Sequence, residues 1–171
     1  MIGTIAQNVI RFIVLVLFQV LILDHIGLGG YLNPFLYVLF ILMLPFETPE
    51  WLVLLLGFVL GLTVDMFTDT LGMHTASSVL LAYLRKYILR LIAPRDGYET
   101  SFKPTFRQMG FNWFLAYAAI LVFAHHFALF YIEIFRLSDF FFTFVKVVFS
   151  SVFTLVLIFI TQFLFQAPRE R

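Results

Sequence analysis

The chain has no cysteine and few charged residues, and each shortage excludes a class of protein. Without cysteine there are no disulfides, no thiolate metal sites and no thiol nucleophile. Only 12% of the 171 residues are charged, whereas 62% are hydrophobic, and the mean hydropathy is +1.00. A soluble globular domain has about a quarter of its residues charged and about half apolar. The composition therefore excludes an ordinary soluble domain and predicts that lipid surrounds most of the chain.

The length limits how much of the chain lies outside the membrane. A membrane-spanning helix takes roughly 20 residues, so six spans use about 120 residues and leave about 50 for connections. We predict an all-α polytopic membrane protein, a six-helix bundle that forms one integral membrane domain over residues 1–171. The predicted spans are about residues 4–23, 34–46, 50–67, 73–93, 108–130 and 139–165.

The second and third predicted spans are short. Pro34 is placed to open the second span, and Pro45 falls near its end. A helix over 34–46 rises only about 20 Å against a hydrocarbon core of about 30 Å. The pair of spans is therefore expected to tilt, to thin the bilayer or to re-enter partly. Two short spans or none leave every later segment on the same side of the membrane.

The basic residues predict the orientation. With six spans, nine of the eleven Lys and Arg residues fall on one side, the exceptions being Arg136 and Lys146. The positive-inside rule makes that side the cytoplasm and places both termini there. We predict a cytoplasmic basic surface that attracts anionic lipid or an acidic partner, formed by Arg85, Lys86, Arg90, Arg95, Lys103 and Arg107.

A line of small residues marks the third span. Gly57, Gly61 and Asp65 follow one another at four-residue spacing and so share one helical face. Glycines at this spacing let two helix backbones approach closely in lipid. We favour packing against another helix of the same chain over contact with a partner. For Asp65 we favour a cap on the next helix, accepting backbone N–H groups, over a direct role in binding.

The remaining polar residues do not form a metal or catalytic motif. Six spans place His25, His74, His125 and His126 at the outer interface, where they are expected to be anchors or packing residues. No H-x-x-x-H element is present, and adjacent histidines point about 100° apart on a helix. Lys146 is expected to snorkel outward or to meet Asp65 or Glu133.

Enzymatic signatures are also missing. Gly61, Asp65 and Asp69 resemble the second half of the CDP-alcohol phosphotransferase signature, but its first half falls on unrelated residues, Glu47, Thr48, Trp51 and Leu52. No nucleophile elbow, zinc-protease or P-loop element occurs. We predict a protein that is not an enzyme, with no cofactor and no nucleic-acid partner.

The block from residue 34 to 72 resembles the rod shape-determining protein MreD family. The similarity covers about 40 residues and rests on Pro34, Gly57, Gly61, Leu62, Asp65, Leu71 and Gly72. It implies a multi-pass protein of the bacterial inner membrane that acts as an adaptor in lateral cell-wall elongation. The implied partners are the bitopic protein MreC, the MreB filament, the RodA glycosyltransferase and its penicillin-binding transpeptidase.

A small-molecule carrier is the alternative. The family's six-helix arrangement is similar to the substrate-binding membrane subunits of energy-coupling-factor transporters, which commonly carry an A-x-x-x-A element in helix one. Here that helix has only Ala6. A carrier also needs an outward pocket with convergent polar groups, for which the candidates are Asp65, Asp69, His74, His125 and Lys146. We favour the adaptor.

Overall fold

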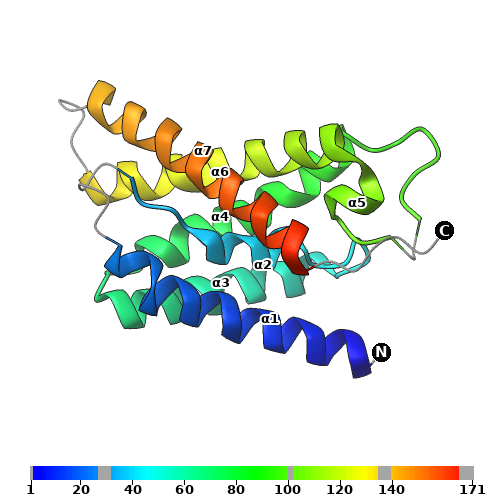
Figure 1. The fold of residues 1–171 in the computed structure, drawn as a ribbon, viewed down its shortest axis with the longest axis horizontal. Coiled ribbons are helices and arrows are strands. Elements are labelled where there is room, and N and C mark those ends of the chain that lie inside the picture. Colours follow the sequence, from blue (N-terminus) through cyan, green and yellow to red (C-terminus); the bar gives the residue numbers. More distant parts are fainter. Residues whose placement is uncertain (1, 27–31, 100–101, 135–139, 166–171) are drawn as a thin grey trace.

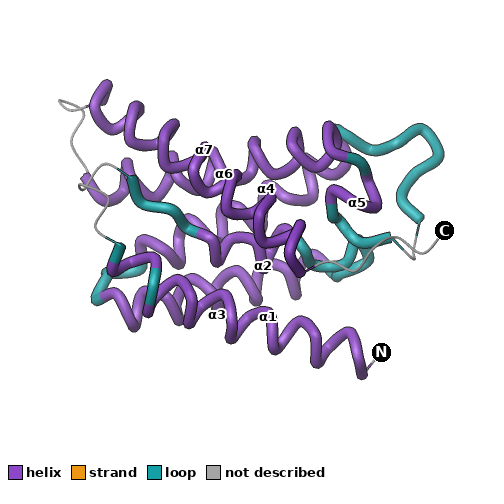
Figure 2. Tube along the Cα trace, in the orientation of Figure 1, coloured by secondary structure: helices purple, strands orange, loops and turns teal. Residues whose placement is uncertain are grey.

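The computed structural model describes residues 2–26, 32–99, 102–134 and 140–165, and this part of the chain is a bundle of helices (Figures 1 and 2). Arg136, Arg169 and Arg171, which contributed to the orientation prediction, lie outside the described residues. The long helices are α1 (Ile2–Leu21), α3 (Glu50–Thr68), α4 (Met73–Leu91), α6 (Phe111–Ile134) and α7 (Phe140–Phe165). The short ones are the 3₁₀ turns η1 (Leu23–His25) and η2 (Leu36–Val38) and the α-helices α2 (Leu39–Leu42) and α5 (Phe106–Met109).

The long helices run along one axis and give the bundle two distinct ends (Figure 1). One end holds the start of α1, the loops before α3 and after α4, and the last turn of α7. We call it the basic end, because the described cations there are Arg11, Arg85, Lys86, Arg90, Arg95, Lys103 and Arg107. The far end holds the end of α1, the α3–α4 turn and the end of α6. Hydrogen bonds join α1 to Lys103 and α7 to α5 at the basic end, from Lys103 Nζ to Gln7 Oε1 (3.5 Å) and from Arg107 Nη2 to the carbonyl of Phe163 (3.1 Å).

Four helical stretches of the described chain are long and apolar enough to cross a membrane: Ile5–His25, Glu50–Thr68, Phe111–Ile134 and Phe140–Phe165. The chain is therefore a helical membrane protein. The predicted helices at 4–23, 50–67, 73–93 and 139–165 are confirmed with small shifts of their ends. The fifth, predicted to start at residue 108, begins only at Phe111 because Gly110, at φ +90°, separates it from α5. α4 is as long as α3 but less apolar, and it packs between α3 and α6.

The segment predicted as the second span differs most from expectation. Helix extends only over Leu36–Leu42, and Pro34 precedes it in a non-helical stretch instead of opening a long helix. From Phe35 to Leu44 every residue is at most 9% exposed, so this segment lies inside the bundle and not against lipid. We call residues 33–44 the central segment. It runs from the far end of the bundle toward the basic end (Figure 1).

The backbone of the central segment is held by side chains of the surrounding helices. Gln19 of α1 accepts a hydrogen bond from the N–H of Leu36 (2.8 Å) and donates one to the carbonyl of Pro34 (3.0 Å). On α7, Ser150 accepts from the N–H of Asn33 and Thr154 from that of Phe35, both at 3.1 Å. Non-helical backbone at membrane depth is tolerated only where protein buries it and satisfies its hydrogen bonds. These side chains therefore allow a short helix to stand where a full span was predicted.

Candidate functional site

Arg85 of α4 is buried, although the sequence placed it on the basic surface. Its side chain is 3% exposed. Nη2 donates to the carbonyls of Leu44 (2.5 Å) and Pro45 (3.3 Å), and Nε donates to the hydroxyl of Tyr117 (3.0 Å). That hydroxyl donates in turn to the carbonyl of Leu42 (3.1 Å). Carbonyls just beyond a helix end carry partial negative charge, so the end of α2 replaces a carboxylate as the partner of this cation.

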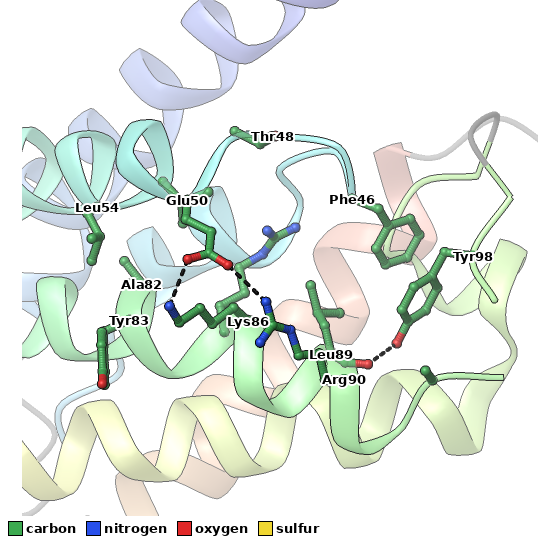
Figure 3. A pocket seen from close by; sticks show the side chains of 13 residues that line it. Phe46, Thr48, Glu50, Leu54, Ala82, Tyr83, Lys86, Leu89, Arg90 and Tyr98 are labelled. Carbon is green, nitrogen blue, oxygen red and sulfur yellow. Dashed lines mark hydrogen bonds and ion pairs between the residues drawn. The ribbon is translucent and has the colours of Figure 1, made fainter.

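Lys86 and Arg90 lie close to Arg85, at the mouth of a groove between the start of α3 and the second half of α4 (Figure 3). Both cations bind Glu50, Lys86 Nζ at 2.7 Å from Oε2 and Arg90 Nη2 at 3.2 Å from Oε1. The groove has a volume of about 370 Å³, and Arg85 also lines it. We call it the basic-end groove.

The walls of the basic-end groove are mainly apolar and aromatic. Tyr98 stacks on Phe46 with ring centroids 4.3 Å apart, and its hydroxyl donates to the carbonyl of Leu89 (2.6 Å) (Figure 3). Lys86 Nζ lies 5.0 Å from the ring centroid of Tyr87. Three of the six residues of the predicted basic surface therefore meet at one groove. The other three do not line it and belong to the loop after α4 and to α5: Arg95, Lys103 and Arg107.

The glycine face of α3 packs against α4 of the same chain. A Cβ at Gly57 would lie 2.9 Å from Cβ of Ala82 and 3.0 Å from the carbonyl oxygen of Ser78. At Gly61 it would lie 2.6 Å from the carbonyl oxygen of His74 and 2.7 Å from the backbone nitrogen of Thr75. The two backbones approach too closely for any side chain at Gly61. The favoured interpretation, packing within the chain, agrees with this contact.

Asp65 continues the glycine face and caps α4. Its Oδ1 accepts from the Thr70 hydroxyl (2.5 Å) and the His74 N–H (3.1 Å), and Oδ2 accepts from the N–H (2.8 Å) and hydroxyl (2.5 Å) of Thr75. A carboxylate at a helix N-terminus satisfies N–H groups that the helix leaves unpaired. Gly72 makes the connecting turn possible with a φ of +84°. The residues from Gly57 to Gly72 thus hold the α3–α4 hairpin closed.

We expect Asp65→Ala to destabilise the protein more than Asp69→Ala. The Asp65 change leaves several donors unpaired and should cost about 2 to 4 kcal/mol. Asp69 ends α3 with a φ of +53° and is exposed, so its replacement should cost less than about 1 kcal/mol. The measurement is the thermal unfolding midpoint of the purified variants in one detergent. Asp69→Gly is the matched control, since glycine accepts this backbone conformation and should unfold no earlier than the parent. Equal midpoints for the two alanine variants would contradict the assignment.

Three of the histidines lie in the core, where the sequence predicted the outer interface. His74, His125 and His126 are at most 6% exposed, whereas His25 is exposed. The Tyr37 hydroxyl lies 2.8 Å from both His74 Nδ1 and His125 Nε2. His126 bonds the carbonyl of Val122 (2.8 Å) and the hydroxyl of Thr154 (3.0 Å). The histidines therefore connect α4, α6 and α7 to the central segment.

The other predicted polar contacts are local. Lys146 lies 3.5 Å from Glu133 and over the ring of Phe130, and Asp65 is not its partner. Among the described residues no cluster of three or more His, Asp or Glu is arranged to hold a metal ion. The sequence analysis missed Gln19, Tyr37 and Tyr117, which are completely buried and hydrogen-bonded to distant segments. Their only signal in the sequence is a polar group within an apolar run.

A comparison of the chain with protein-family models, curated proteins and solved structures finds no significant match. Its fold and side-chain contacts define a helical membrane protein with a buried polar interior and one basic end.

Proposed function

We propose that this protein is a non-enzymatic adaptor in the cytoplasmic membrane of a bacterium, acting in the lateral cell-wall elongation machinery. The resemblance to the MreD family motivates the proposal. In the structure, four of the residues that carry this resemblance shape the α3–α4 hairpin: Gly57, Gly61, Asp65 and Gly72. The proposed role is to bridge an MreC-like bitopic protein, an MreB-like filament, and the RodA glycosyltransferase with its penicillin-binding transpeptidase.

The observation that carries the proposal is how the interior polar groups are used. The carrier alternative needs Asp65, Asp69, His74, His125 and Lys146 to converge on a ligand. Asp69 is exposed at the end of α3. Instead Asp65 caps α4, the two histidines bind Tyr37, and Lys146 meets Glu133. Groups that hold the bundle's own elements together are not arranged around a substrate. This favours a protein that works through its outer surface, as an adaptor does.

The proposed orientation puts the basic end in the cytoplasm. The described Lys and Arg residues at the basic end outnumber those at the far end. The far end carries four described carboxylates, Asp24, Asp65, Asp69 and Glu133, and one described lysine, Lys146. The positive-inside rule then places the start of α1 and the end of α7 on the cytoplasmic side. We further propose that the central segment completes a sixth crossing between the two ends, because protein and not lipid surrounds its backbone.

The experiment is a pull-down of the tagged full chain from its own bacterium in a mild detergent. We expect an MreC-like bitopic protein and an MreB-like filament protein to be recovered. The double variant Arg95→Gln/Lys103→Gln, which removes exposed cations at the basic end, should lower recovery of the filament protein severalfold and leave the bitopic partner unchanged.

Two results would contradict the proposal. Recovery of an ATPase and a coupling subunit in place of these partners would identify a carrier. Failure to recover either partner, with the protein folded and at its normal abundance, would refute the adaptor role. The abundance of the double variant is measured alongside and should match the parent, since exposed substitutions of this kind rarely change stability by more than about 0.5 kcal/mol.

A further inference from the structure

We propose that the basic-end groove binds the phosphate-bearing headgroup of an anionic phospholipid. This inference is independent of the adaptor role. It rests on the side chains at the mouth of the groove, where two cations, Lys86 and Arg90, share one carboxylate, Glu50. Arg85 adds a third positive charge to the lining. Cations therefore exceed carboxylates among the lining residues, and the groove attracts an anion.

The groove also contains donors that the protein leaves available. Arg85 uses Nε and Nη2 for Tyr117, Leu44 and Pro45, while Nη1 has no hydrogen-bond partner among the described residues. α3 begins beside the groove at Glu50, directly after its N-cap residue Pro49, and no side chain caps this helix. The unpaired N–H groups at the start of α3 carry partial positive charge, which adds to the positive charge that Arg85, Lys86 and Arg90 bring to the groove.

Glu50 acts as an internal substitute for the ligand's phosphate. Its two carboxylate oxygens each take one cation, Oε2 from Lys86 and Oε1 from Arg90. Two phosphate oxygens can accept the same pair of donors. The side chain of Glu50 is 53% exposed, so it can swing into solvent when a phosphate replaces it. Glu50 is therefore a competitor whose removal strengthens binding.

The walls and the position of the groove favour a lipid over a free anion. Apolar side chains line the groove: Leu54 is partly exposed, and Val53, Ala82 and Leu89 are buried behind it. Such a lining suits the glycerol and upper acyl region of a phospholipid. Trp51, next to Glu50 in the first turn of α3, is 66% exposed, and Tyr87 is exposed near the end of α4. Exposed tryptophan and tyrosine at helix ends are typical of the headgroup level of a bilayer. The charged mouth thus lies where lipid phosphates lie.

The experiment is a lipid titration of the purified full chain in detergent, followed by native mass spectrometry. Phosphatidylglycerol and phosphatidylcholine with identical acyl chains are compared, and we expect a clear preference for phosphatidylglycerol. Lys86→Gln and Arg90→Gln should each weaken its binding about fivefold, since a cation near a lipid surface contributes about 1 kcal/mol. Glu50→Gln should strengthen it. Arg95→Gln removes an exposed arginine at the same end that does not line the groove, so it is the matched control and should leave phosphatidylglycerol binding unchanged.

Several outcomes would overturn the proposal. Equal weakening by Arg95→Gln and Arg90→Gln would mean general attraction to the basic end and no defined site. No gain from Glu50→Gln would remove the competitor argument. Displacement of the lipid by excess inorganic phosphate would identify a site for free anions, and displacement by a synthetic acidic peptide would identify a protein-docking site. Thermal unfolding of every variant confirms that the compared proteins are folded.

Discussion

Gly61→Leu should largely prevent recovery of folded protein. Even a Cβ at this position would lie 2.6 Å from the carbonyl oxygen of His74 and 2.7 Å from the backbone nitrogen of Thr75. Both are backbone atoms at the start of α4, so no rotamer change can relieve the clash. The start of α4 would therefore have to move away from α3, and this movement would break the hydrogen bonds from His74 and Thr75 to Asp65. Overpacking a close contact costs about 1 to 3 kcal/mol, and we expect at least about 3 kcal/mol here because backbone must move.

The measurement is the yield of monodisperse protein in detergent together with its thermal unfolding midpoint. Gly57→Leu should also destabilise the bundle, but less, because one of its two nearest contacts is the Cβ of Ala82 and not backbone. Met66→Leu is the matched control: it places the same side chain on α3 at a position that is 74% exposed, and it should behave like the parent. Normal yield and midpoint for both glycine variants would show that the glycine face is not a close contact.

Arg85→Met should lower the stability of the protein by about 3 kcal/mol. The substitution removes the donors for the carbonyls of Leu44 and Pro45 and for the oxygen of Tyr117. Each buried acceptor left unpaired costs about 1 to 3 kcal/mol, and methionine recovers part of this by filling the space. Arg85→Lys should be intermediate, since an ammonium group keeps the charge but cannot reproduce the forked donor geometry.

For a chain of this length a loss of 3 kcal/mol lowers the midpoint of thermal unfolding by roughly 10 °C. Arg90→Met is the control, because Arg90 lies five residues further along α4 and its side chain is 71% exposed. It should change the stability by less than about 0.5 kcal/mol. If the two methionine variants unfold at the same temperature, Arg85 does not stabilise the end of α2.

Helix positions were largely predictable, because bilayer thickness dictates how long an apolar segment must be and glycine and proline mark its ends. The limits of α3, for example, differ from the prediction by a single residue. The spacing of Gly57, Gly61 and Asp65 also indicated the face that meets another helix, since that spacing follows from helix geometry alone.

The central segment and Arg85 were not predictable, for one common reason. The partners of their polar groups lie far away in the sequence: Thr154 is 119 residues from Phe35, and Leu44 is 41 residues from Arg85. Hydropathy describes each residue with its neighbours along the chain, so it assigned a helix to residues 34–46 and a surface position to Arg85. In the structure, hydrogen bonds across the bundle bury the central segment and Arg85 instead.

The histidines illustrate the same limit. Their place in the sequence put them at one end of the bundle, and only packing around Tyr37 brought His74 and His125 together in the core. The sequence by itself determined that lipid is the solvent, where the long helices lie to within a few residues, and which face of α3 carries the glycines for close packing. The tertiary structure decided where each polar group finds its partner, because a buried donor or acceptor must be satisfied by whichever segment packing brings to it.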